Sequence, residues 1–418
     1  MAEENRAPAG MPDILPVSAA VLSRLERQRR NALRARGGCG VGCEEVDQHV
    51  LLGGLERGSV VGISSDEDFG LLLSFQIVAR ALWRAFVTGA PEKALVISTQ
   101  PTGVVARILR DAIMAQARGT DGDVKGKARE VLAMASIVRV FDVKGVWEAL
   151  DDLDVGETPS PFPTSPMECN TPERSQFTEA DTKAIRDEIP DSDEEVSLSP
   201  SPPPAPAAPA AEPMQKESKP GLCKPDLILI THFSTLLTTL FTHTEKNTAH
   251  TSLQLLSSHL RHLARSMSSS PLILITNAIT TSSSGPAPAA ASLETGPLFH
   301  DSSSARHRSR QVDPTLRSIF NTPGPYQTNR SSGKPSFGLV FAQFLDLHLL
   351  CTKIPRTRED AEAMAMGRSG EQVWVVEGLL DEQGVWDGRK GPRKGRERRW
   401  GVVDWVSGMV VDAFEGER

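Results

Sequence analysis

Short apolar runs, separated by amphipathic stretches, limit most strongly what this chain can fold into. Runs of about five apolar residues favour buried strands, whereas apolar side chains at i, i+3 and i+4 favour helices. The expected strands are residues 59–63, 94–98, 137–141, 226–230, 271–277, 337–342, 345–351, 373–376 and 400–405. Helices are expected from 71 to 82, 104 to 117 and 250 to 267. This alternation predicts an α/β fold, with a mainly parallel sheet flanked by helices and an antiparallel C-terminal edge.

Residues 18–36 form a further expected helix, in which apolar positions alternate with many arginines, and Gly37 and Gly38 end it. A solvated basic face is the simpler interpretation of this stretch. Contact with phosphate or with an acidic partner is the alternative.

Two long segments interrupt the alternation. Residues 151–222 are acidic and then rich in Pro and Ala, and residues 279–335 are rich in Ser, Ala and Pro and then basic. Such composition predicts disordered inserts, the first with several Ser-Pro and Thr-Pro steps that suit phosphorylation. Residues 151–200 carry 14 acidic and 3 basic side chains, so the net charge of −7 originates there. We therefore expect an N-terminal tail and basic helix (1–36), core parts at 37–150, 223–278 and 336–418, and inserts at 151–222 and 279–335.

The cysteines and the apolar runs limit the cellular setting. Five scattered cysteines, an odd number, favour free thiols in a reducing compartment. Cys39 and Cys43, with His49 nearby, suggest a metal site, but the second ligand pair that zinc needs does not follow at a suitable spacing. The longest apolar candidate for a membrane span, residues 227–241, contains His232 and several Thr and Ser, so no membrane association is expected.

The block from Gly42 to Leu82 resembles the start of the ATPase core in eukaryotic RecA-like DNA recombinases and their paralogues. The resemblance rests on Gly42-Cys43 and on the run Leu51-Leu52-Gly53-Gly54-Leu55-Glu56-Arg57-Gly58-Ser59, and on the order of the later pieces, about 200 residues in all. It implies a RecA-like P-loop NTPase core. A Rossmann-like fold of another family is the alternative, and would need a glycine fingerprint after a strand.

At the phosphate-binding loop the sequence departs from this family. The loop needs G-x-x-x-x-G-K-[ST], in which glycines let N–H groups surround the phosphates, lysine binds oxygen and the hydroxyl holds Mg²⁺. Aligned from Gly62, through Ser64 and Ser65, the second glycine is replaced by Glu67, the lysine by Asp68 and the hydroxyl by Phe69. These are degenerate nucleotide-binding positions, and each like-charge contact with phosphate costs about 1–4 kcal/mol.

Three further positions of the implied ATPase site are also changed. The family's catalytic glutamate aligns with Gln100, whose amide is not a base. Its metal-supporting aspartate aligns with Thr231, and its γ-phosphate-sensing glutamine aligns with Ala278. The resemblance therefore implies no catalytic residues and no cofactor, with ATP and Mg²⁺ disfavoured.

Two basic regions are candidates for DNA contact. The family's DNA-binding loop corresponds to residues 279–335, and a second basic cluster at residues 389–399 also suits nuclear import. The candidate residues are Arg306, Arg308, Arg310, Arg317, Lys334, Lys390, Arg393 and Lys394. The family's F-x-x-A self-assembly segment aligns with residues 17–20, where Val17 replaces the aromatic ring, so partners other than itself are expected.

These expectations combine into one functional hypothesis with two alternatives. The chain is expected to be a nuclear, non-catalytic accessory protein in homologous-recombination DNA repair. It would bind a recombinase or recombinase paralogues as a hetero-oligomer, and DNA as a further partner. The alternatives are a DNA-dependent ATPase with a divergent nucleotide site and a phospho-regulated nuclear scaffold without DNA binding.

Overall fold

The computed structural model describes residues 18–66, 68–118, 123–154, 224–280, 318–320, 333–383 and 399–414. The chain divides into two units, one made of residues 1–156 and 222–418 and the other of residues 157–221. All described residues belong to the first unit. Most of the two expected inserts, the loop at 384–398 and residues 1–17 lie outside the described residues.

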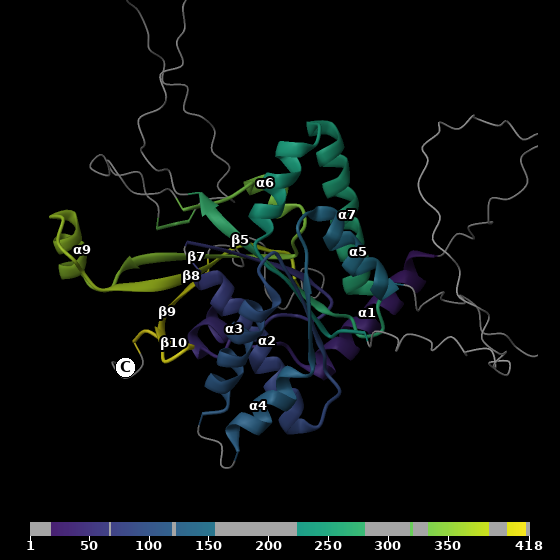
Figure 1. The fold of residues 1–418 in the computed structure, drawn as a ribbon, viewed down its shortest axis with the longest axis horizontal. Helices are drawn as coiled ribbons and strands as arrows, with labels where there is room; N and C mark the ends of the chain where they lie inside the picture. The colour runs from purple at the N-terminus through teal and green to yellow at the C-terminus, as the bar shows by residue number, and fades with distance from the viewer. Residues whose placement is uncertain are drawn as a thin grey trace, which may run out of the picture. The chain divides into compact units, whose positions relative to one another are not determined.

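The core of the first unit is a mixed sheet whose central strands run parallel (Figure 1). The parallel strands are β1 (Val60–Ser65), β2 (Ala94–Ser98), β3 (Ala135–Arg139), β4 (Leu227–Ile230), β5 (Leu272–Thr280) and β7 (Leu347–Pro355). Their order across the sheet is β7-β1-β5-β4-β2-β3. The predicted α/β class with a mainly parallel sheet is confirmed.

The C-terminal part adds antiparallel strands beyond β7, as the sequence predicted. These are β8 (Gln372–Asp381), β9 (Trp400–Val406) and β10 (Met409–Asp412), and a short β6 (Lys334–Pro335) pairs with the end of β5. Helix α9 (Arg358–Ala365) lies at the end of the β7–β8 hairpin (Figure 1).

One expected strand is wrong. Residues 337–342 form the short helix α8 (Gly338–Ala342) rather than a strand. A helical turn brings Phe341 and Phe344, three residues apart, onto one side, where both rings contact Phe233. The burial of these two rings outweighs the β-propensity of the run, to which Phe337 and Val340 also contribute.

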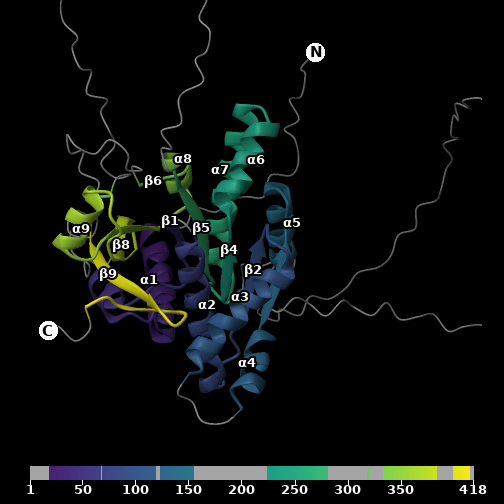
Figure 2. The ribbon, with the colours of Figure 1, turned by 60° about the vertical axis from the view of Figure 1, so that its left-hand side comes forward.

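Helices cover both faces of the sheet, and each face has its own apolar core (Figures 1 and 2). Helices α2 (Phe69–Thr88), α3 (Thr102–Gln116) and α4 (Val124–Leu132) pack on one face. Helices α5 (Val143–Asp154), α6 (Phe233–His243), α7 (Lys246–Ser266) and α8 pack on the other. This two-sided cover explains why the parallel strands are continuous apolar runs rather than alternating ones.

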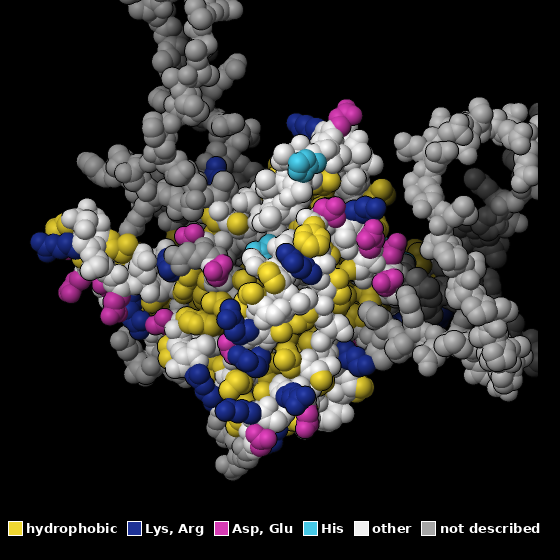
Figure 3. Space-filling model, in the orientation of Figure 1, with side chains coloured by type: hydrophobic (Ala, Val, Ile, Leu, Met, Phe, Trp, Pro, Cys, Tyr) yellow, Lys and Arg dark blue, Asp and Glu magenta, His cyan; other side chains and the backbone are white. Residues whose placement is uncertain are grey.

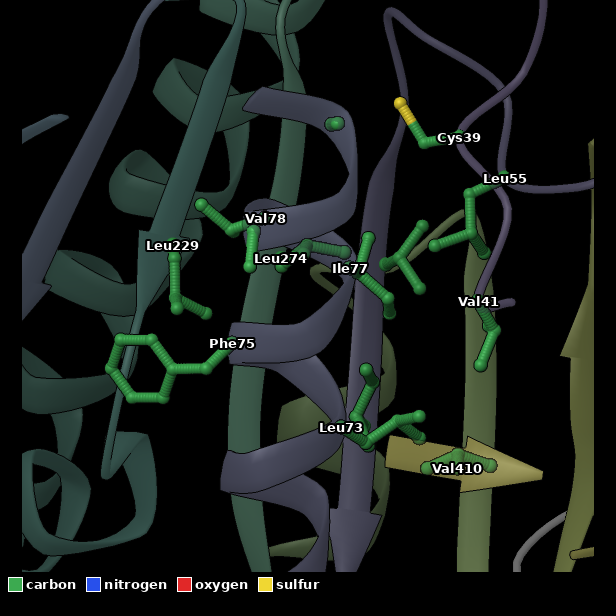
Figure 4. Close-up of a cluster of buried hydrophobic side chains, with 14 of the residues drawn as sticks. Cys39, Val41, Leu55, Leu73, Phe75, Ile77, Val78, Leu229, Leu274 and Val410 are labelled. Carbon is green, nitrogen blue, oxygen red and sulfur yellow. The ribbon is translucent and has the colours of Figure 1, made fainter. Parts of the chain in front are cut away.

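Helix α2 is the centre of the first core. Figure 4 shows Phe75 and Val78 on the side of Leu229 and Leu274 in the sheet, whereas Ile77 lies toward Val41 and Leu55. The N-terminal segment that carries Val41 thus packs beside α2, on the Ile77 side of the helix (Figure 4). A helix buried on two sides has apolar side chains around most of its circumference.

The predicted basic helix at the N-terminus is confirmed as α1 (Ala19–Arg36), with the Ser18 hydroxyl capping its first turn. None of its residues is fully buried. Its last residue joins it to the core, because Arg36 forms an ion pair with Asp226, at 2.6 Å, at the start of β4. A π-helical turn, η1 (Glu45–Val50), follows.

The close packing around Gly62 in β1 generates the first prediction. A Cβ at Gly62 would overlap the Leu345 side chain and lie 2.9 Å from Phe341 Cε1, and both neighbours are fully buried. Gly62→Ala should lower the free energy of unfolding by about 1–3 kcal/mol. Urea-induced unfolding followed by circular dichroism measures this loss.

Gly103→Ala in the first turn of α3 is the matched control, because no atom lies within 4 Å of a Cβ placed there. It should be neutral or stabilise by up to about 1 kcal/mol. Equal effects of the two substitutions would show that the Gly62 packing is incorrect.

Candidate functional site

The carboxyl ends of the parallel strands are where α/β sheets of this kind bind ligands. Most of the sequence-predicted nucleotide positions lie at this edge. Ser64 and Ser65 end β1, Thr231 follows β4, and Gln100 follows β2. The structure therefore brings these four residues to one edge of the sheet.

The connection between β1 and α2 is a tight turn. The strand ends at Ser65 and the helix begins at Phe69, so only residues 66–68 separate them. Gly62, which aligns with the first glycine of the implied phosphate-binding loop, lies within β1, in the strand expected at 59–63, and is paired with Ile275 on one side and His348 on the other. Because the backbone from Gly62 to Ser65 is committed to two neighbouring strands, it does not form a ring of N–H groups around a phosphate.

Phe69 has a structural role where the resemblance implies a metal-binding hydroxyl. Its ring is 3% exposed and stacks on Trp374, with ring centroids 4.1 Å apart. It also meets the edge of Trp405 at 6.2 Å. This residue fastens the first turn of α2 to the antiparallel strands β8 and β9, and a serine or threonine there would lose that contact.

A polar chain joins the ends of β2 and β4. The Thr231 hydroxyl donates to Ser98 Oγ at 2.8 Å, and the Gln100 backbone N–H donates to the same oxygen at 3.1 Å. His232 Nδ1 lies 3.0 Å from Thr231 Oγ1. The Thr231 hydroxyl therefore links the end of β2 to the His232 ring.

His232 brings the β1 turn and the β4 end into one site. It adopts a left-handed backbone (φ 55°), which is rare for a residue with a side chain, and its N–H donates to Thr276 Oγ1 at 3.0 Å. Burial lowers the pKa of the His232 imidazole, and the nearby Asp68 carboxylate partly opposes that shift. The structure thus places Asp68 and His232 at the same edge, with a neutral imidazole beside a carboxylate.

A second polar cluster lies on the opposite face of β1, and sequence reasoning missed it. Ser64 Oγ lies 2.9 Å from His348 Nε2, and Asn277 Nδ2 donates to Ser64 Oγ at 3.3 Å and to the Ser336 carbonyl at 2.9 Å. Ser64 and His348 are both fully buried. A histidine inside the apolar run 345–351 was the available signal.

This serine–histidine pair is enclosed in the core, away from solvent. Burial lowers the pKa of His348 to about 3, so its imidazole is neutral at physiological pH. The ring of Phe341 meets the imidazole edge-on at 5.2 Å. The cluster serves to connect β1, β5 and β7 through polar contacts within an apolar core.

Of the remaining predicted positions, two lie within the described residues. Ala278 is exposed in β5, paired with Ser65 in β1, and Lys334 is exposed in β6. The other predicted positions, at Glu67, Arg306, Arg308, Arg310, Arg317, Lys390, Arg393 and Lys394, lie outside the described residues, as does Val17 of the expected self-assembly segment.

The sequence also raised the question of a metal site at Cys39 and Cys43. Cys39 and Cys43 are buried free thiols, and Cys43 Sγ donates to Asp412 at 2.6 Å. Within the described ranges, no group of three or more histidine, cysteine or acidic side chains is arranged for a metal ion.

Helix α2 is long and apolar enough to span a membrane, but 56% of its most apolar stretch is buried in the core. The expected candidate, residues 227–241, is instead divided between β4 and α6.

No protein-family model matches this chain, and no curated protein matches its sequence.

The buried His348 predicts a pH-dependent stability. Its pKa is about 6.5 in the unfolded chain and about 3 in the folded chain. Between these values the unfolded state binds more protons, so the free energy of unfolding falls as the pH falls, by about 1.4 kcal/mol per pH unit. Above pH 6.5 this contribution is constant.

Urea unfolding at steps from pH 7 to pH 4 measures this slope. His348→Gln should reduce the slope by the contribution of one proton, whereas His262→Gln, on the exposed surface of α7, should leave it unchanged. An identical slope in the wild type and His348→Gln would contradict the neutral buried imidazole.

Proposed function

We propose that this protein is a non-catalytic accessory protein, similar to recombinase paralogues, that acts in homologous-recombination DNA repair. The observation that carries this proposal is the first turn of α2. Phe69 is buried against Trp374 where the resemblance implies a hydroxyl for Mg²⁺, and Asp68 precedes it where the resemblance implies a lysine.

The start of α2 is the natural place for an anion at this edge. Helix N-termini attract negative charge through their free N–H groups and the helix dipole. Here that place is next to the carboxylates of Asp66 and Asp68, which belong to the chain itself. A triphosphate would meet them as like charges, at a cost of about 1–4 kcal/mol per contact.

The RecA-like core itself is supported by the positions of the resembling pieces. The runs at 94–100, 137–141, 226–231 and 275–277 fall on or directly after β2, β3, β4 and β5, in one parallel sheet. Such a core, with its nucleotide chemistry replaced, retains its surfaces for binding other proteins.

Helix α1 supports a heteromeric partner. Leu22 and Leu25 are 55% and 53% exposed, one turn apart, beside the exposed arginines Arg24 and Arg27. Apolar side chains bordered by arginine are typical of protein-binding surfaces. The helix begins at Ala19, within residues 17–20, the segment that resembles the assembly motif of the recombinases.

DNA contact and nuclear location complete the proposal. Exposed basic side chains lie on α3 and α4, among them Arg107, Arg110, Lys125 and Arg129, and Figure 3 shows Lys and Arg spread over that face. With the basic loop at 279–335 they would contact phosphates without reading sequence. The basic cluster at 389–399 suits nuclear import.

The first prediction from this proposal concerns nucleotide. The protein should show no saturable binding of Mg-ATP and no DNA-stimulated hydrolysis, because the loop and the charges needed for both are replaced. Fluorescent ATP titration and phosphate release measure these properties. Saturable Mg-ATP binding together with DNA-stimulated turnover would instead establish a divergent ATPase.

The second prediction concerns partners. Co-purification from nuclear extract should recover a recombinase-type protein, and the double substitution Leu22→Asp and Leu25→Asp should reduce its recovery about tenfold or more. Leu255→Asp on α7, at a site 58% exposed, is the matched control and should not change recovery. Recovery of no such partner, with and without DNA, would contradict the proposal.

A further inference from the structure

A small cavity lies at the amino ends of the parallel strands, at the opposite edge of the sheet from the candidate nucleotide site. Its volume is about 30 Å³, and it is bordered by Gly38, Cys39 and Gly40 of the N-terminal segment. Arg57, just before β1, and Glu92, just before β2, also line it. A cavity of this size holds one or two water molecules or a small ion.

Arg57 is the residue that makes this cavity unusual. It is only 7% exposed, and its Nη2 forms an ion pair with Glu92 Oε1 at 2.6 Å. Its Nε and Nη1 are buried and have no acceptor within the described part of the chain. A guanidinium whose N–H groups are removed from water without an acceptor is strongly destabilising, so these donors require a partner.

Further positive charge surrounds the same cavity. Arg80 and Arg84, one turn apart on α2, also line it, so three guanidinium groups and the carboxylate of Glu92 border the cavity. The Asp47 carboxylate lies close to Gly40 and attracts Arg80, but its two oxygens bind the Val41 and Gly42 N–H groups. Arg84 Nη1 also donates to the Gly38 carbonyl, at 3.4 Å. Arg80 and Arg84 are exposed, which places them at the mouth of the cavity rather than in its interior.

The neighbouring acidic groups do not complete the charge balance. Burial raises the pKa of the Cys39 thiol, so this residue is neutral and is not a counter-ion for Arg57. Asp226 acts on Arg57 at longer range, but its two oxygens bind the Arg36 guanidinium and the Lys93 N–H. An acceptor for the remaining N–H groups of Arg57 must come from outside these side chains.

We propose that this cavity binds one small inorganic anion, held by Arg57 in the interior and by Arg80 and Arg84 at the mouth. The anion would accept hydrogen bonds from the free guanidinium N–H groups. It would thereby connect three parts of the chain: the segment 37–42, helix α2 and the loop before β2. The small volume excludes a nucleotide. The site is separate from the edge on which the proposed function depends, and either can fail without the other.

Thermal unfolding of the full-length protein tests the site. The probes are sodium phosphate and sodium chloride, each titrated against sodium gluconate at constant ionic strength, because gluconate is too large for the cavity. A ligand that binds only the folded state raises Tm, by about 5 °C or more at one hundred times its Kd. We expect phosphate or chloride to produce such a saturable rise.

Substitutions at the mouth separate specific binding from general salt effects. Arg80→Met with Arg84→Met should shift the titration to at least tenfold higher anion concentration, and these exposed positions leave the core unchanged. Arg107→Met, at an exposed arginine of α3, is the matched control and should titrate as the wild type does. Arg57→Met should abolish the rise, but it also leaves Glu92 without its ion-pair partner, so the mouth variant is the decisive one.

Crystals grown in bromide give a direct view of the cavity. An anomalous peak within hydrogen-bonding distance of the Arg57 guanidinium would confirm the proposal. Two results would overturn it: no saturable rise in Tm with either anion, or an equal rise in the wild type and in the mouth variant. A cavity that contains only water in the bromide crystals would overturn it as well.

Discussion

The burial of helix α2 on two sides is the constraint on which the rest of this structure depends. One side of the helix packs on the parallel sheet, and the N-terminal segment that carries Val41 and Leu55 packs on its Ile77 side (Figure 4). Its first turn is fastened by Phe69 between Trp374 and Trp405. Because all three contacts must be made at once, the position of α2 determines where the ends of β1 lie and what shape the neighbouring turn can have.

The same constraint explains why the carboxyl edge of the sheet does not have the form of a phosphate-binding site. A strand that extends to Ser65 and a helix that begins at Phe69 leave a turn of three residues. The hydroxyls nearby bind one another, since Thr231 donates to Ser98 and His232 contacts Thr231. Polar groups satisfied in this way stabilise the edge and have less capacity to bind a ligand.

At the amino ends of the parallel strands, by contrast, buried hydrogen-bond donors lack acceptors. There the glycine-rich segment lies close against residues 53–55, because Cys39 forms a β-bridge with Leu55, and Arg57 is enclosed with two of its donors unsatisfied. Glycine at position 38 allows this approach, because a Cβ there would lie 3.0 Å from the Gly53 carbonyl. The two edges therefore differ in chemistry: the carboxyl edge carries the chain's own anions, and the amino edge carries excess cationic donors.

The sequence by itself determined the α/β class of fold. Apolar runs and their spacing are local, and they specified every parallel strand and the basic helix α1 to within a few residues. Only the tertiary structure decided that β1 continues to Ser65, that residues 338–342 are helical and that His348 and Arg57 are buried. These outcomes depend on contacts between segments far apart in the chain, such as Gly62 with Leu345, and no local pattern encodes them.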